Sequence, residues 1–131
     1  MGQGLFIELE REIEGLDLKM DGRALLKNEG SLSTRCEELG VTPLMPFICP
    51  TVEQQSASMA SFGIEGVEAA PQRWYEPEIG LATLRVLRQH VQSESRWFYE
   101  SEALLRDLES MERILNGAKV AGVRWHLGLD F

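Results

Sequence analysis

The sequence predicts an α+β domain in which a small sheet contains the N- and C-terminal strands and packs on three or four helices. Near both ends of the chain, apolar and polar residues alternate with a period of two, which is typical of half-buried strands. Between these runs, apolar residues recur at spacings of three and four, which is typical of amphipathic helices. The 131 residues contain no linker-like segment, so we expect a single domain over residues 1–131.

The two predicted strands cover residues 5–13 and 123–131. Their odd-numbered residues, apart from Arg11, are apolar and are expected to face the core, while the even-numbered residues face water. The simplest arrangement places the strands in one sheet, and the strand order within it stays open. If the two strands are neighbours, Arg124 and His126 lie opposite a row of acidic residues, and such opposite charges support strand pairing; the row comprises Glu8, Glu10 and Glu12.

Residues 22–39 are predicted to form a short first turn and a second helix with a break near Asn28–Gly30, because Gly30 would cost about 1 kcal/mol inside one continuous helix. We expect Ser31 or Ser33 to cap the second helix and Gly40 to follow its end. The spacing of four apolar residues places them on one buried face: Leu25, Leu32, Cys36 and Leu39.

The middle of the chain is predicted to be less regular. Three prolines make residues 41–50 an extended connector that is anchored by apolar side chains. Thr51 can cap a short helix that runs to about Ala60, and residues 63–72 are predicted to be a loop.

Two longer helices are predicted in the second half of the chain. The first begins at Pro77, since proline fits the first helical position, and its apolar arc is wide enough to contact more than one element. The second is capped by Ser101, has the clearest amphipathic pattern, and continues to about Ala121, with Gly122 after its end. The arc of the first helix consists of Ile79, Leu81, Leu84, Val86, Leu87, His90 and Val91.

The chain is acidic, with a formal net charge of −8. Residues 1–70 contain 12 acidic and 5 basic residues, whereas residues 71–131 contain 9 and 8. An acidic N-terminal half repels nucleic acid and anionic membrane surfaces, so we expect neither as a partner. A basic protein partner remains open, and so does the alternative that the charge only maintains solubility.

Cysteine usage predicts a reduced, cytoplasmic protein. Cys36 and Cys49 form no disulfide framework, no secretory signal precedes them, and no apolar stretch approaches the length of a membrane span. A zinc site made from these cysteines with His90 and His126 lacks the close ligand spacing of known zinc sites. We therefore predict no metal and no cofactor.

The candidate interface combines acidic and aromatic residues. The glutamates at positions 8, 10 and 12 cannot converge on one cation from alternate strand positions, so they are either a patch for a basic partner or a solvated strand face. Trp97 and Tyr99 flank Phe98 among charged residues. Tyrosine and tryptophan are favoured interface anchors, but the same rings could instead cover the core between the last two helices.

An alternative reading places a ligand pocket between the sheet and the helix that begins at Pro77. Its candidate lining residues are Trp74, His90, Trp125 and His126. We assign no catalytic residue, because the serines and histidines form no recognisable nucleophile motif and Cys49 shows no sign of activation.

Several segments resemble a group of small uncharacterised bacterial proteins that have no established activity. The likeness spans most of the chain and rests on residues 2–3, 7–10, 21–25, 38–44, 80–84, 107–112 and 122–126. It implies a bacterial cytosolic domain and supplies no site residue.

Two functions follow as hypotheses. The first is a non-enzymatic protein-interaction module with an acidic face, of which an inhibitor or immunity protein for a basic toxin is one form. The second is a small enzyme or ligand-binding protein that uses the pocket described above. The sequence does not decide whether the chain forms homo-oligomers.

Overall fold

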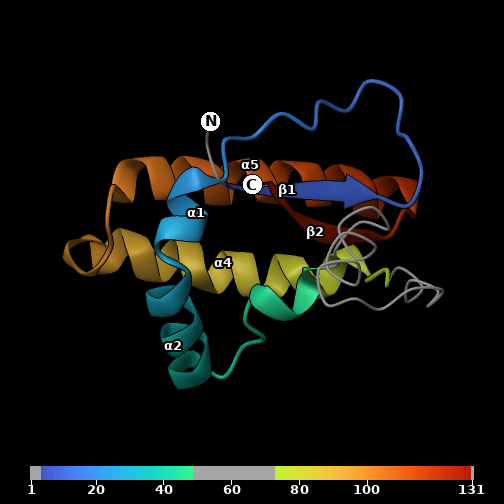
Figure 1. Cartoon of the computed structure of the whole chain (residues 1–131). Helices are drawn as coiled ribbons and strands as arrows, with labels where there is room; N and C mark the ends of the chain where they lie inside the picture. Colours follow the sequence, from blue (N-terminus) through green and yellow to red (C-terminus); the bar gives the residue numbers. More distant parts are fainter. Residues whose placement is uncertain (1–3, 49–72, 131) are drawn as a thin grey trace, which may run out of the picture.

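A computed structural model describes residues 4–48 and 73–130 (Figure 1). The α+β class is confirmed, with a two-stranded antiparallel sheet and four helices in this part of the chain. Cys49, the predicted helix of residues 51–60 and the predicted loop of residues 63–72 lie outside the described residues. The elements are β1 (Gly4–Leu9), α1 (Arg23–Lys27), α2 (Glu29–Leu39), the 3-10 turn η1 (Met45–Phe47), α4 (Pro77–Ser93), the 3-10 turn η2 (Ser95–Trp97), α5 (Ser101–Ala121) and β2 (Trp125–Asp130).

The two terminal strands lie in one sheet, as predicted, and the structure shows that they are neighbours. They pair antiparallel with Glu8 opposite His126 and Leu9 opposite Trp125. Both are shorter than predicted, because β1 ends at Leu9 and β2 begins at Trp125. One further backbone hydrogen bond, from Glu10 N to the Arg124 carbonyl at 2.9 Å, closes this end of the sheet. The residues after Glu10 leave the sheet and form a loop.

One face of the sheet forms part of the core, as the alternation predicts. Leu5, Ile7, Trp125 and Leu127 are at most 3% exposed. The prediction that even-numbered residues face water is wrong for His126, which is fully buried. The indole of Trp74 stacks on the His126 imidazole at a centroid distance of 4.1 Å and shields it from solvent. The alternation along the strand cannot reveal this contact, because Trp74 lies in another segment of the chain.

The helices α4 and α5 form an antiparallel hairpin that supplies most of the core (Figure 1). An ion pair between Arg88 and Glu112 joins them at 3.2 Å. Gly80 on α4 allows the indole of Trp125 to pack directly against the helix backbone, since a Cβ at this position would overlap the ring. The fully buried side chains of the hairpin are Leu84, Leu87, Val91, Leu104, Leu108, Met111, Ile114, Leu115 and Ala118.

The short helices α1 and α2 lie at one end of this hairpin (Figure 1). The break between them is confirmed and falls at Asn28, within the predicted interval. The predicted caps are wrong, because α2 already begins at Glu29 and Ser31 and Ser33 lie inside it. Gly40 ends α2 in the left-handed conformation, with φ of 72°, as predicted. Leu39 was expected to be buried but is 41% exposed, because it lies in the last turn of α2.

The bounds of the two long helices, α4 and α5, agree closely with the prediction. Pro77 is the first residue of α4, and Gly122 follows α5 with φ of 69°. The N-cap of α5 is Glu100 and not Ser101, and Ile79 at the solvent edge of the apolar arc is 46% exposed instead of buried. Within the described residues, no helix has the length and apolar character that crossing a membrane requires.

Candidate functional site

The acidic residues of the predicted interface are largely engaged within the sheet. The Glu8 carboxylate lies 2.6 Å from His126 Nε2, and Glu10 forms an ion pair with Arg124. The predicted cross-strand pairing of opposite charges is therefore confirmed for these two pairs. Glu12 lies beyond the strand, in the loop that follows it, and is exposed. The structure thus does not present the three glutamates as one unpaired row.

His126 connects three segments of the chain from a fully buried position. Its Nδ1 lies 2.9 Å from the Arg73 carbonyl oxygen, which can only accept, so Nδ1 carries a proton. Its Nε2 faces the Glu8 carboxylate, and the stacked Trp74 covers the ring. Because each polar atom of the imidazole has a partner and no solvent reaches it, His126 holds the sheet together instead of forming an accessible site.

The four candidate pocket residues do not converge on one cavity. Trp74 and His126 are in contact on one face of the sheet, whereas Trp125 points to the opposite face. The indole of Trp125 fills the space between the sheet and α4, with Nε1 donating to the Glu76 carbonyl at 3.1 Å. His90 lies towards the end of α4, against Phe98. None of the three cavities described below is lined by any of these four residues.

The turn between α4 and α5 presents two aromatic side chains to solvent. We call residues 95–100 the aromatic loop. Trp97 is 55% exposed and Tyr99 is 72% exposed, whereas Phe98 between them is only 8% exposed. The two readings of this cluster therefore both apply, because Phe98 covers the core and its neighbours face outward.

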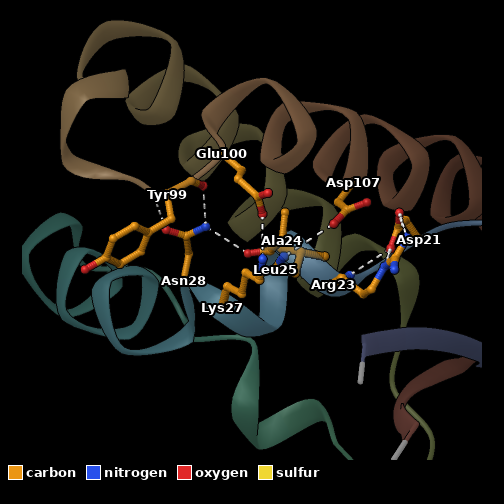
Figure 2. Close-up of polar contacts among 9 residues, drawn as sticks. All are labelled: Asp21, Arg23, Ala24, Leu25, Lys27, Asn28, Tyr99, Glu100 and Asp107. Carbon is orange, nitrogen blue, oxygen red and sulfur yellow. Dashed lines mark hydrogen bonds and ion pairs between the residues drawn. The ribbon is translucent and has the colours of Figure 1, made fainter. Parts of the chain in front are cut away.

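The aromatic loop is held from beneath by α1 and by the α1–α2 junction (Figure 2). The side-chain amide of Asn28, which is 1% exposed, exchanges two hydrogen bonds with the backbone of Tyr99. Lys27 forms an ion pair with Glu100 at 3.0 Å, and Glu100 adopts a left-handed conformation with φ of 46°. These contacts fix the backbone from which both rings project.

Polar contacts also position the ring of Trp97. Its Nε1 donates to the Glu94 carboxylate at 3.2 Å. The guanidinium groups of Arg35 and Arg96 lie 5.6 Å and 5.4 Å from the ring centroid, which is within cation–π range. The exposed indole is therefore an oriented surface feature with defined neighbours.

Beside Trp97, one face of α2 forms a depression of about 300 Å³, which we call the α2 groove. Nothing lies within 4 Å of the position that a Cβ of Gly30 would occupy. The absence of a side chain there leaves the floor of the groove open, in a helix where glycine is otherwise unfavourable. The lining residues are Gly30, Ser31, Thr34, Arg35, Glu38 and Trp97.

A second depression, of about 250 Å³, contains a buried carboxylate, that of Asp107 (Figure 2). Burial raises the pKa of this carboxyl above its ordinary value, a property that often marks a catalytic acid or base. Here both oxygens are engaged, since they accept hydrogen bonds from Gly22 N at 3.1 Å and Leu25 N at 3.3 Å. The geometry assigns Asp107 a capping role at the start of α1.

The capping role of Asp107 follows from the backbone at Gly22. This residue has φ of 73° and packs against the backbone of Leu5, so no residue with a side chain fits there. The N-cap of α1 consequently lacks a side chain of its own, and Asp107 supplies the acceptor from α5. Sequence reasoning missed this residue, although an aspartate on the apolar face of a predicted helix was a signal that could have revealed it.

No described residues form a metal site, since no group of three or more His, Cys, Asp or Glu side chains converges among them. Cys36 is fully buried, and burial raises the pKa of its thiol to about 11. A thiol with so high a pKa is a poor nucleophile and a poor metal ligand at neutral pH, because the thiolate is the reactive form.

Comparison with known proteins found no family model, no curated protein and no solved structure that matches this chain. Among the described residues, the accessible features include the aromatic loop and the α2 groove, while the buried side chains of Asn28, Asp107 and His126 are engaged in hydrogen bonds within the fold.

Proposed function

We propose that this protein is a non-enzymatic interaction module that binds a protein partner through the aromatic loop and the adjacent α2 groove. The observation that supports this most directly is the exposure of Trp97 and Tyr99, at 55% and 72%, on either side of a buried Phe98. Tryptophan and tyrosine are enriched among the residues that dominate binding energy at protein interfaces. Two such rings on one short loop are the best candidates for anchors on the described surface.

The support beneath the loop strengthens the proposal. Binding costs free energy when a mobile loop or side chain must be ordered, and a loop already fixed in place avoids part of that cost. Asn28 fixes the backbone of Tyr99, and Glu94 and Arg35 position Trp97. The α2 groove beside Trp97 can accept a side chain of the partner. The surface therefore combines two projecting aromatic rings with a neighbouring depression.

The charge of the chain favours a basic partner. A net charge of −8 attracts basic proteins and accelerates their association, with an effect that falls as salt screens it. Inhibition of a basic toxin is one form that such a module takes, and the identity of the bound protein decides whether it applies here.

The test is affinity capture of binding proteins from extract of the native cell, with the whole chain as bait. We expect one partner in stoichiometric amount, which the double variant Trp97→Ser/Tyr99→Ser fails to capture. The matched control is Ile79→Ser/Val120→Ser, which removes two exposed apolar side chains elsewhere on the surface, 46% and 90% exposed, and should capture the same partner. Equal capture by both double variants, or no capture by the wild type at low salt, would contradict the proposal.

A second measurement tests the groove separately. Gly30→Ala adds a methyl group to open space on α2 and should make the fold slightly more stable. The same methyl group narrows the α2 groove, so we expect weaker binding of the captured partner. A variant that gains stability and loses affinity separates the groove's part in binding from any part in folding, and unchanged affinity would exclude the groove from the interface.

A further inference from the structure

The segment between β1 and α1, residues 10–22, has no regular secondary structure. Long connections without helix or strand are uncommon in compact domains and are often functional. Figure 1 shows this segment running alongside α5. Arg113 on α5 donates to the carbonyl oxygens of Asp17 and Lys19, at 2.6 Å and 3.3 Å. The Arg11 guanidinium donates to the Ala121 carbonyl at 2.9 Å. The segment is therefore attached to α5 at Arg11 and again at Asp17 and Lys19.

Between these ties the segment forms a depression of about 490 Å³, which we call the acidic depression. The Leu16 side chain packs closely on Gly117 of α5 and so attaches the segment to this helix. A Cβ added at Gly117 would lie 2.8 Å from a methyl carbon of Leu16. Leu18 is 40% exposed. The lining alternates between apolar and acidic side chains and consists of Glu12, Ile13, Glu14, Leu16 and Leu18.

The carboxylates of this lining are available to a partner. Glu12 and Glu14 are exposed, and neither forms an ion pair with any residue that the structure describes. Arg11 and Arg113 lie nearby and keep their positive charge, but their guanidinium groups are hydrogen-bonded to backbone carbonyls and form no ion pair with Glu12 or Glu14. In contrast, Glu8 is paired with His126 of β2, and Glu10 with Arg124 just before that strand. The glutamates of the former row that form no ion pair with a described residue therefore lie at the depression and not on the strand.

We propose that the acidic depression docks a basic amphipathic segment of a protein partner, one that carries lysine or arginine beside a stripe of apolar side chains. The apolar side chains would cover Ile13, Leu16 and Leu18, while the cations pair with Glu12 and Glu14. This surface is separate from the aromatic loop, because Ser101 and Gly117 lie at opposite ends of α5 and about 24 Å apart, at 1.5 Å per residue. Binding at the acidic depression can therefore be tested independently of binding at the aromatic loop.

The probe is a labelled synthetic peptide of leucine and lysine with helical spacing, titrated with the whole chain and followed by fluorescence anisotropy. We expect saturable binding that weakens as salt is raised, because screening reduces the attraction between exposed charges. A peptide with serine in place of leucine tests the apolar contribution, and one with glutamate in place of lysine tests the charge. Both should bind far more weakly than the probe.

Variants locate the contact on the protein. Glu12→Lys/Glu14→Lys should weaken binding roughly tenfold, as expected when attractive charges at an interface become repulsive. Glu102→Lys/Glu109→Lys is the matched control, since it changes the net charge equally at exposed positions of α5 and should have a much smaller effect. Leu18→Ser should also weaken binding, although it leaves the charge unchanged.

Several outcomes would overturn the inference. These are the absence of peptide binding, equal weakening by the two double variants, or equal binding of the serine peptide, which would leave only a general charge effect. A free chain that sediments as a dimer and becomes monomeric with Leu18→Ser would show that a second copy covers the depression instead. Loss of the aromatic residues should not alter peptide binding, so this test remains informative if the aromatic loop has no partner.

Discussion

The side-chain amide of Asn28 forms two hydrogen bonds with the backbone of Tyr99, donating to its carbonyl oxygen at 2.9 Å and accepting from its N–H at 2.8 Å. The amide nitrogen also donates to the Ala24 carbonyl at 2.8 Å. Asn28 therefore lies between α1 and α2, and its buried side chain links the last turn of α1 to the aromatic loop (Figure 2). The presentation of Tyr99 depends on a residue 71 positions away in sequence.

Asn28→Asp should destabilise the protein by about 2–3 kcal/mol, because it removes both amide donors and places a carboxylate beside two carbonyl oxygens. Urea unfolding measures the change, and hydrogen exchange should show a less protected Tyr99 amide. The control is Asn116→Asp at an exposed position of α5, where we expect a change within about 0.5 kcal/mol. Similar losses in the two variants would argue against the linking role of Asn28.

The Asp107 carboxyl should make stability depend on pH in an unusual direction. Burial, and next the charge of Asp21, raise its pKa above 3.8, so the native protein holds this proton more tightly than the unfolded chain does. As pH rises through the interval between 3.8 and the raised native pKa, the unfolded chain releases its proton first, and the contribution of Asp107 to the unfolding free energy falls.

Asp107→Asn removes this titration. The unfolding free energy of the wild type minus that of the variant should therefore decrease from about pH 4 upwards and become constant once Asp107 is ionised in both states. Urea unfolding at several pH values gives the difference. Glu109→Gln, an exposed position on the same helix, serves as the control and should show no such decrease. A difference that instead grows with pH would mean that the α1 hydrogen bonds outweigh burial.

Two glycines near the starts of helices, Gly30 in α2 and Gly80 in α4, should respond to the same substitution with opposite signs. Gly30→Ala should stabilise the protein by about 0.5–1 kcal/mol, since the new methyl group enters open space and alanine favours the helix. Gly80→Ala should destabilise it by about 1–3 kcal/mol, because the methyl group overlaps the Trp125 ring. Chemical denaturation compares both with the wild type. Changes of the same sign would show that the packing around Trp125 or Gly30 differs from that described.

The two cross-strand charge pairs should differ in strength. A double-mutant cycle with Glu8→Ala and His126→Ala should give a coupling free energy of about 1–3 kcal/mol, because His126 is fully buried. The same cycle for Glu10 and Arg124, which are exposed, should give less than about 1 kcal/mol and should decrease further in high salt. Equal coupling energies for the two pairs would contradict the difference in burial.

The period-two runs at the chain ends determined the two strands, and their charges indicated that Arg124 and His126 lie opposite the glutamate row if the strands are neighbours. The pairs Glu8–His126 and Glu10–Arg124 come from the register that the structure shows. The two long helices were equally predictable, because spacings of three and four over many residues leave few alternatives. These features depend on neighbours along the chain, so the sequence contains the information needed to recognise them. A similar local argument indicated that at least one of Trp97, Phe98 and Tyr99 lies near the surface, since three consecutive rings cannot all enter one core, but it left open which of them.

The tertiary structure alone decided which polar residues are buried and which acidic residues remain unpaired. His126 has the sequence pattern of a solvent-facing residue, and only Trp74, 52 positions earlier, covers it. Asp107 and Asn28 act on segments that lie more than 70 positions away, so no local pattern marks their partners. Contacts between distant segments form only when the whole chain packs. The acidic row is for that reason divided, because Glu8 and Glu10 are paired at the sheet, whereas Glu12 in the loop after it forms no ion pair with any residue that the structure describes.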